Sequence, residues 1–177
     1  PSSSDFSLVN VNDLIFVNMP ERLTIIDFVE KYTREYASHV FLREKPADHW
    51  TETTFEQTRL EAYRVAAGLM SLGINKGDRI SLLSEGRNLW VIGELGILYA
   101  GAVNVPLSIK LEEGSDLVFR IRHSDSRFVM VSGSQLPKIR RIVSELPALE
   151  KIIVFDEIED RRDNEITMSE VLALGDA

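Results

Sequence analysis

The chain contains no cysteine among its 177 residues. This absence excludes disulfide bonds and catalysis by a thiol, and nothing in the sequence points to an oxidising compartment. Histidine is scarce as well. The three histidines, His39, His49 and His123, are too far apart in sequence to form the helical pair that is typical of zinc sites. We therefore expect no metal-binding residue in this chain.

An excess of positive charge is also missing. The chain has 20 Lys and Arg residues against 28 Asp and Glu residues, which gives a net charge of −8. Nucleic-acid binding needs clustered Lys and Arg, so we expect no nucleic-acid partner. Residues 1–5 show no basic region followed by an apolar run, so we expect no signal peptide. These features favour a cytoplasmic protein.

One stretch raises the alternative of a membrane-spanning helix. Residues 89–107 are almost wholly apolar and are long enough to cross a bilayer. Glu94 lies inside this stretch, however, and a charge in mid-membrane is costly. Gly101 and Pro106 interrupt the run. A buried helix followed by a buried strand accounts for it better, so no transmembrane segment is expected.

The sequence lacks a complete phosphate-binding loop. Neither Gly-x-Gly-x-x-Gly nor Gly-x-x-x-x-Gly-Lys-Ser/Thr occurs. The nearest approach is Ser-Gly-Ser-Gln-Leu-Pro-Lys at residues 132–138, between a predicted strand and a predicted helix, where backbone N–H groups could hold an anion. Leu136 stands where a second glycine would be needed, so we interpret the segment as a plain turn. Adjacent His123, Ser124 and Asp125 likewise predict a helix end and not a catalytic triad.

What the sequence does contain is an ordinary globular composition, with 44% hydrophobic and 27% charged residues. Helical periodicity and capping residues predict helices over residues 24–36, 53–72, 88–99, 112–123 and 137–146. Apolar β-favouring runs predict a hairpin from residues 40–42 and 50–53, and strands over residues 79–84, 103–106, 127–132 and 151–155. From residue 79 onward strands and helices alternate. The expected fold is therefore α/β, with a mostly parallel sheet, helices on both faces, and an N-terminal helix and β-hairpin.

Four local features give sharper expectations. Met70 is placed on the apolar face of the helix over residues 53–72, and Asn88 is predicted to cap the next helix. Gly101 lies where that helix meets the following strand, so a positive φ is expected there. The run Asp-Glu-Ile-Glu-Asp-Arg-Arg-Asp-Asn-Glu at residues 156–165 is interpreted as a solvated connector.

Several blocks together resemble a known family. They are Thr53-Thr54-Phe55-Glu56-Gln57, Lys76-Gly77-Asp78-Arg79-Ile80, Asn88-Leu89-Trp90, and Leu-Tyr-Ala-Gly-Ala-Val-Asn-Val-Pro-Leu at residues 98–107. In this order and spacing they resemble the N-terminal region of the adenylate-forming (AMP-binding) superfamily, which includes acyl-CoA synthetases, peptide-synthetase adenylation domains and luciferases. The resemblance covers most of residues 23–155. Residues 83–85, 128–133 and 146–156 look most like long-chain fatty acid–CoA ligases.

The resemblance implies a reaction in two steps. Such enzymes join a carboxylate to AMP with release of pyrophosphate, and then pass the acyl group to coenzyme A. For the full-length enzyme it implies a fatty acid substrate, ATP, magnesium and coenzyme A as cofactors, and a role in fatty acid metabolism. It leaves peripheral membrane attachment open.

The resemblance also implies a division of the chain into an N-terminal extension, residues 1–22, and an N-terminal subdomain of the AMP-binding domain, residues 23–177. The phosphate loop and the catalytic lysine of the family come after the matching segment. We therefore assign no catalytic, cofactor-binding or metal-binding residue, and we expect the 177-residue chain to be inactive and to bind no cofactor.

Two alternatives remain open from the sequence. The chain could belong to another acyl or aryl acid ligase, or it could be a stand-alone α/β binding module without catalysis. The sequence that follows Ala177 would separate them, because a Ser-Gly-Thr-Thr-Gly-type loop there would indicate a ligase. We also expect the chain to associate as a homodimer through an exposed flank of its sheet.

Overall fold

The computed structural model describes residues 23–45, 48–112 and 114–177. The expected extension at residues 1–22 lies outside the described residues. The helices are α2 (Ile25–Tyr36), α3 (Phe55–Ser71), α4 (Asn88–Tyr99), α5 (Ser115–His123), α6 (Leu136–Ile142), the short 3-10 helix η1 (Val143–Glu145) and α7 (Met168–Gly175). The strands are β1 (Val40–Glu44), β2 (Thr51–Thr54), β3 (Arg79–Leu83), β4 (Val103–Leu107), β5 (Phe128–Val131), β6 (Lys151–Val154) and β7 (Glu165–Thr167).

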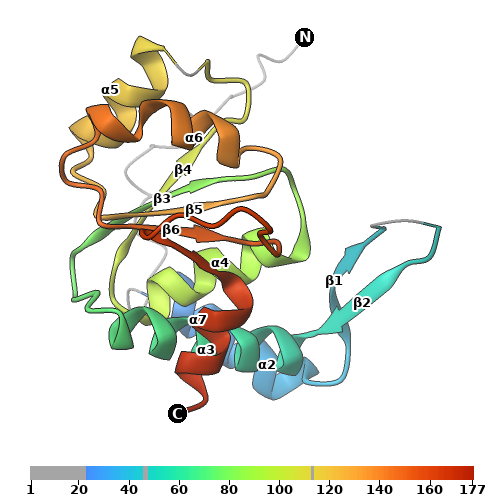
Figure 1. The fold of residues 1–177 in the computed structure, drawn as a ribbon. Coiled ribbons are helices and arrows are strands. Elements are labelled where there is room, and N and C mark those ends of the chain that lie inside the picture. The colour runs from blue at the N-terminus through green and yellow to red at the C-terminus, as the bar shows by residue number, and fades with distance from the viewer. Residues whose placement is uncertain (1–22, 46–47, 113) are drawn as a thin grey trace, which may run out of the picture.

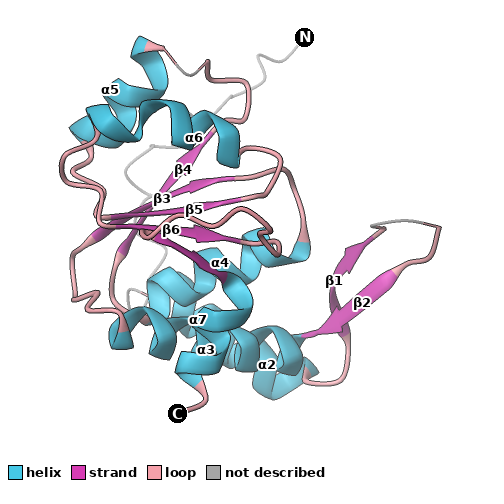
Figure 2. Cartoon of the chain, viewed as in Figure 1, coloured by secondary structure: helices cyan, strands magenta, loops and turns pink. Residues whose placement is uncertain are grey.

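A five-stranded parallel sheet forms the centre of the fold. Its strand order is β4-β3-β5-β6-β7, and every neighbouring pair is parallel. Figure 1 shows α5 and α6 on one face of the sheet, and α4, α3, α7 and α2 on the other. The antiparallel hairpin β1-β2 projects to the side of this assembly (Figure 2). The predicted α/β class with helices on both faces is confirmed.

Each face of the sheet has its own hydrophobic core. Side chains such as Ile80, Leu82 and Met130 point toward α3, α4 and α7. Their neighbours along the strands, such as Val129 and Val131, point toward α5 and α6. Since successive strand residues face opposite sides, strands that are covered on both faces must be apolar throughout. This explains why the apolar runs in the sequence do not alternate with polar residues.

Local signals fix the starts of the first two helices. The Thr24 side chain accepts a hydrogen bond from the Asp27 backbone N–H, and the Asp27 carboxylate accepts one from the Thr24 backbone. Thr54 and Gln57 form the same reciprocal capping box at the start of α3. Each box satisfies two N–H groups that a helix start otherwise leaves without partners. The helices predicted over residues 24–36 and 53–72 are confirmed, and they begin at Ile25 and Phe55.

A backbone-to-backbone contact holds α7 against α3. A side chain on Gly68 of α3 would have its Cβ 2.1 Å from the carbonyl oxygen of Val171 on α7. Only glycine permits two helices to approach so closely. Arg64 of α3 also forms an ion pair with Asp176, directly after α7. Helix α7 therefore packs directly against α3.

Two predicted positions are wrong. Met70 is 59% exposed and does not contribute to the core, although Ala62, Ala66 and Leu69 of the same predicted face are buried. Asn88 is the first residue of α4 and not its cap, because Arg87 occupies the capping position without a side-chain hydrogen bond. The Asn88 amide instead donates to Thr53 Oγ1 at 3.2 Å.

The interpretation of residues 156–165 as a solvated connector is wrong at its last residue. Glu165 begins strand β7, and its side chain is completely buried. It is paired with Arg140 of α6, at 2.7 Å between Arg140 Nη2 and Glu165 Oε2. The pair makes burial of this charge possible, because an unpaired carboxylate in the interior is costly. Strand β7 and helix α7 were not predicted.

The apolar stretch at residues 89–107 forms the buried helix α4 and the edge strand β4, as expected. Within residues 23–45, 48–112 and 114–177, no helix is both long enough and apolar enough to cross a bilayer. Gly101, between α4 and β4, has the predicted positive φ of 71°. The helices expected over residues 112–123 and 137–146 are shorter than predicted, as α5 and α6.

Candidate functional site

The strand order of the sheet contains a reversal point. The chain runs from β3 outward to β4, crosses back over β3, and continues through β5, β6 and β7 in one direction. In open parallel sheets with this pattern, ligands bind outside the carboxyl ends of the strands at the reversal. Here that place lies between the ends of β3 and β5. The residues that follow these two strands therefore form the candidate site.

Glu85, just after β3, is the centre of a polar network at this place. Its Oε1 accepts hydrogen bonds from Ser134 Oγ at 2.8 Å and from Gln135 Nε2 at 2.6 Å, both from the turn after β5. Burial by itself would raise the pKa of Glu85. Hydrogen bonds from Ser132, the Glu85 backbone, Gln135 and Ser134 outweigh it and lower the pKa to about 2. The side chain is therefore a carboxylate at neutral pH.

An ion pair extends the network to the next strand. Arg87 Nη1 lies 2.8 and 3.0 Å from the two carboxylate oxygens of Asp156, which follows β6. Asp156 Oδ2 also accepts a hydrogen bond from the backbone N–H of Gly133 at 2.7 Å. The guanidinium of Arg87 lies over the ring of Phe155 as well, at 5.9 Å from its centroid. The loops after β3, β5 and β6 are thus tied together.

Residues 132–135 form a turn between β5 and α6, as predicted. The Gly133 N–H, which could have faced an anion, is used by the carboxylate of Asp156. Lys138 donates to the carbonyl oxygens of Ile109 at 2.7 Å and Leu111 at 3.2 Å, so it holds the loop after β4. The Gly133 N–H group and the Lys138 side chain are therefore both engaged within the chain.

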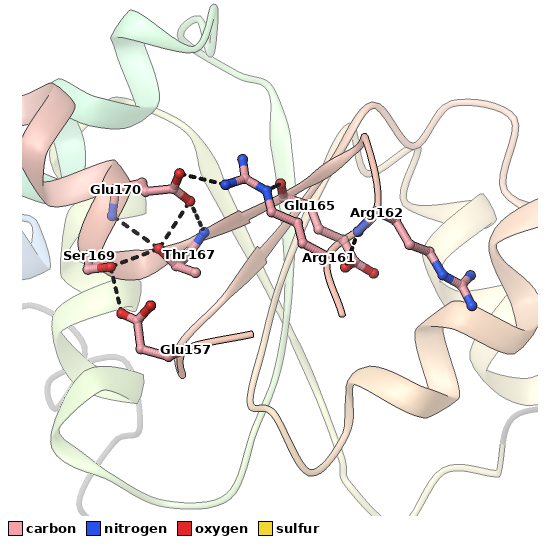
Figure 3. Close-up of polar contacts among 7 residues, drawn as sticks. All are labelled: Glu157, Arg161, Arg162, Glu165, Thr167, Ser169 and Glu170. Atoms are coloured by element: carbon pink, nitrogen blue, oxygen red, sulfur yellow. Dashed lines mark hydrogen bonds and ion pairs between the residues drawn. The ribbon is translucent and has the colours of Figure 1, made fainter. Parts of the chain in front are cut away.

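A further group of polar contacts joins the loop before β7, strand β7 and the start of α7 (Figure 3). Thr167 caps α7 through a reciprocal pair of hydrogen bonds with Glu170. Glu170 Oε1 accepts from Arg161 Nη1 at 2.6 Å, and Ser169 Oγ donates to Glu157 Oε1 at 2.8 Å. Because these contacts cap a helix and close a loop, we assign them a structural role.

The hairpin borders the candidate site on one side. An open groove of about 490 Å³ lies between the hairpin and the loop after β3, and Trp50, Arg43, Gly86 and Arg87 are among its lining residues. Glu44, at the end of β1, accepts a hydrogen bond from the backbone N–H of Asn88 at 2.6 Å. The hairpin is therefore joined to the start of α4 at the edge of the groove.

The arrangement supports binding and positioning more than proton transfer. Ser134 donates to Glu85, which resembles a hydroxyl beside a base, but a carboxylate with a pKa of about 2 is a weak base at neutral pH. In the part of the chain that the structure describes, no group of three or more His, Cys, Asp or Glu side chains is placed to hold a metal ion. The expectation that no catalytic, cofactor-binding or metal-binding residue lies in this chain stays a prediction.

The sequence contains a signal for this network, but the prediction of separate helices and strands does not reveal it. Ser84 and Ser132 end two of the predicted strands, Glu85 follows the first of these, and Asp156 follows a third predicted strand. The carboxyl ends of parallel strands meet at one edge of a sheet, so these residues had to lie close together. Which partners they choose depends on the strand order, which the sequence pattern does not give.

Comparisons with known proteins agree with this geometry. The chain matches the family model described as AMP-binding enzyme over residues 29–173. A long-chain-fatty-acid–CoA ligase of Xenopus laevis is 24% identical over 155 residues, which cover 86% of this chain and 21% of that protein. A 4-hydroxybutyrate–CoA ligase of Metallosphaera sedula is 24% identical over 149 residues, covering 84% of this chain and 26% of that protein. The chain thus spans about a quarter of the length of these relatives.

A solved structure shows the same fold. The crystal structure of the anthranilate CoA ligase AuaEII, in complex with anthranoyl-AMP, superposes with a TM-score of 0.79 at 26% identity. The superposition covers 88% of this chain and 29% of that one. The family match extends over most of the chain, and it includes the sheet and all the loops of the candidate site. The chain belongs to the AMP-binding enzyme family.

Proposed function

We propose that this chain is the N-terminal part of an AMP-forming ligase that acts on long-chain fatty acids. In the first step the fatty acid carboxylate attacks the α-phosphate of ATP, which gives an acyl-adenylate and pyrophosphate. In the second step the thiol of coenzyme A attacks the acyl carbonyl, which gives the acyl-CoA and AMP. The observation that carries the proposal is the family match over residues 29–173. The similarity to the Xenopus laevis long-chain ligase supports the choice of substrate.

The described residues do not fit a complete site for ATP and magnesium. Arg87 is paired with Asp156, and Lys138 is held by two carbonyl oxygens, so neither is placed to bind a triphosphate. Stabilising the charge of the transferred group needs such donors and a metal ion. We therefore propose that ATP, magnesium and coenzyme A are held by parts of the enzyme outside residues 1–177, and that residues 23–177 are a subdomain preceded by an extension.

The role proposed for residues 23–177 is to hold rigid the sheet edge on which the rest of the site is assembled. Glu85, Arg87 and Asp156 tie together the ends of three strands at the reversal point. Positioning within about 0.5 Å is what a binding site demands of its scaffold. The enzyme is proposed to be cytoplasmic, and the 177-residue chain is proposed to form a homodimer.

An assay of the isolated chain tests the proposal first. Purified chain with ATP, magnesium and palmitate is expected to release no pyrophosphate above a blank, and equilibrium dialysis is expected to show no bound ATP. In a second experiment, residues 23–177 are inserted into the Xenopus laevis ligase in place of its matched segment. The chimera is expected to form AMP in a palmitate-dependent reaction. A chimera that folds, judged by circular dichroism, but does not react would favour a stand-alone binding module.

An aryl acid is the second candidate substrate, because the anthranilate ligase superposes over 88% of this chain. Steady-state kinetics of the full-length enzyme with palmitate and with anthranilate distinguish the two candidate substrates. Its kcat/KM for palmitate is expected to exceed that for anthranilate by at least about tenfold, since a long apolar chain gains binding energy with each buried methylene. A preference for anthranilate would overturn the long-chain assignment and leave the ligase assignment intact.

A further inference from the structure

The orientation of α2 is fixed by one carboxylate. Glu30 accepts hydrogen bonds from Tyr63 Oη of α3 at 2.6 Å and from Tyr99 Oη of α4 at 2.7 Å. Arg59 of α3 pairs with the other carboxylate oxygen at 3.3 Å. These contacts bind the face of α2 that carries Glu30 to the rest of the protein. The helix cannot rotate without breaking three polar contacts at once.

Fixing this face leaves an aromatic stripe on the outside. Ile25, Phe28, Tyr32 and Tyr36 lie along one side of α2, and all four are exposed. The rings of Phe28, Tyr32 and Tyr36 stack in sequence, with centroids 6.3 and 6.1 Å apart. Figure 1 shows α2 on the outer side of its layer, beside α3 and next to the hairpin. A helix face of this kind is a candidate contact surface.

The stripe borders a cavity. About 290 Å³ of open space lies among Ile25, Phe28 and Tyr32 of α2, Phe41 of β1 and Phe55 of α3. Its walls are almost entirely apolar, and an aromatic or aliphatic side chain from outside would fit against them. Aromatic side chains that fill such pockets supply most of the binding energy at protein interfaces.

The two charged residues beside the stripe are arranged so that they can pair with the same two residues on a second copy of the chain. Lys31 directly precedes Tyr32, and Glu35 directly precedes Tyr36, so both lie on the same side of the stripe. The Lys31 ammonium lies 5.6 Å from the centroid of the Tyr32 ring, close to the stripe. If a second α2 packs antiparallel on the first, each Lys31 comes opposite Glu35 of the second copy. A two-fold contact requires this reciprocity.

We propose that the aromatic stripe of α2 is the surface through which two copies of this chain associate. Two α2 helices would pack antiparallel about a two-fold axis, and each would place an aromatic side chain into the cavity beside the other. Lys31 and Glu35 would flank the contact on both copies. The inference rests on the proposed self-association, and it places the contact on α2 and not on a flank of the sheet.

Sedimentation velocity over a range of concentrations tests the proposal. The double variant Phe28→Ser/Tyr32→Ser is expected to raise the dimer dissociation constant at least about tenfold, as the loss of central aromatic anchors does. The matched control is Phe119→Ser, since Phe119 is 62% exposed on α5 in the opposite layer. The control is expected to leave the dissociation constant unchanged. Circular dichroism confirms that each variant folds.

A charge exchange gives a sharper test. Lys31→Glu and Glu35→Lys each place like charges across the proposed contact, and each is expected to weaken the dimer about threefold or more. The double variant Lys31→Glu/Glu35→Lys restores opposite charges, so its dissociation constant is expected to return to near that of the unchanged chain. Weakening by both single changes without this recovery would overturn the antiparallel arrangement.

Other results would assign the surface differently. A dimer that persists in Phe28→Ser/Tyr32→Ser but is lost in Val103→Lys, on the exposed edge of β4, would place the contact at the sheet flank and overturn this inference alone. A chain that dimerises only after deletion of residues 1–22 would identify that segment as the occupant of the stripe. A monomer at every concentration would overturn both the self-association and the contact, while the ligase proposal is judged separately by pyrophosphate release.

Discussion

The carboxylate of Glu44 accepts a hydrogen bond from the backbone N–H of Asn88 at 2.6 Å, so the hairpin caps a helix of the main body. α4 has no side-chain cap of its own, because the Arg87 side chain makes no capping hydrogen bond. A carboxylate at a helix start satisfies a free N–H group and interacts favourably with the helix dipole. The contact joins residues 44 positions apart in the chain.

We predict that Glu44→Ala lowers the free energy of unfolding by about 1 kcal/mol, which is typical of losing a helix cap. The matched control is Glu52→Ala, because Glu52 forms an exposed ion pair with Arg43 on the same hairpin. Exposed pairs contribute little, so the control is expected to change stability by less than about 0.5 kcal/mol. Urea denaturation measures both. Equal effects of the two variants would show that Glu44 does not cap α4.

We predict that Gly101→Val destabilises the protein by about 1–3 kcal/mol, as a strained backbone does. Gly101 has a φ of 71°, and its missing Cβ would meet Lys76 only at 3.4 Å, so the expected cost comes from the backbone and not from a clash. Gly86→Val serves as the control, since nothing lies within 4 Å of its Cβ position and its φ is not positive. An unchanged denaturation midpoint for Gly101→Val would contradict the assigned conformation.

We predict that Arg140→Met lowers the stability at neutral pH by about 3–5 kcal/mol, because it leaves the buried carboxylate of Glu165 without its partner. The exposed ion pair of Arg43 with Glu52 provides the control, and Arg43→Met is expected to cost less than about 1 kcal/mol. Thermal or urea unfolding at pH 7 distinguishes the two variants.

The same pair predicts a dependence on pH. The hydrogen bonds from Arg140, which outweigh burial, hold the pKa of Glu165 below its ordinary value of 4.5. The stabilisation from this lowered pKa is therefore fully present above about pH 4.5 and is lost as the pH falls through the lower folded-state pKa. The difference in stability between the natural chain and Arg140→Met is expected to shrink below pH 4.5. A difference that stays constant from pH 7 to pH 3 would contradict this.

We predict that Gly68→Ala destabilises the protein by about 1–3 kcal/mol, in the range of overpacked core positions. The added methyl would lie 2.1 Å from the carbonyl oxygen of Val171, so α7 must move away from α3. Gly114→Ala is the control, because nothing lies within 4 Å of its Cβ position. Hydrogen exchange of the α7 amides is expected to quicken in the first variant only.

The sequence predicts those parts of the fold whose causes are local. The capping box at Thr54 and the positive φ of Gly101 each depend on residues within one turn, and both are confirmed. Asn88 was assigned wrongly because the group that satisfies its N–H belongs to Glu44, on another element. The burial of Glu165 was not predicted, because its partner, Arg140, comes from another element, α6.

The candidate site shows the same limit. Glu85 and Ser134 are 49 positions apart and meet only because β3 and β5 are neighbours in the sheet. The helical periodicity of residues 24–36 predicts helix α2 correctly, but it does not show which face of the helix is buried. That choice is made by Glu30, through hydroxyl groups of Tyr63 and Tyr99 on two other helices.

The close seating of α7 on α3 has a consequence for how the chain reaches its fold during synthesis. All five strands of the parallel sheet lie between the two helices along the chain, and Arg64 and Asp176 are 112 positions apart. Synthesis proceeds from the N-terminus to the C-terminus. The surface of α3 around Gly68 therefore stays exposed until α7 has left the ribosome. Contacts of such long sequence separation form slowly. The nascent chain is therefore expected to present α3 to chaperones until α7 has emerged.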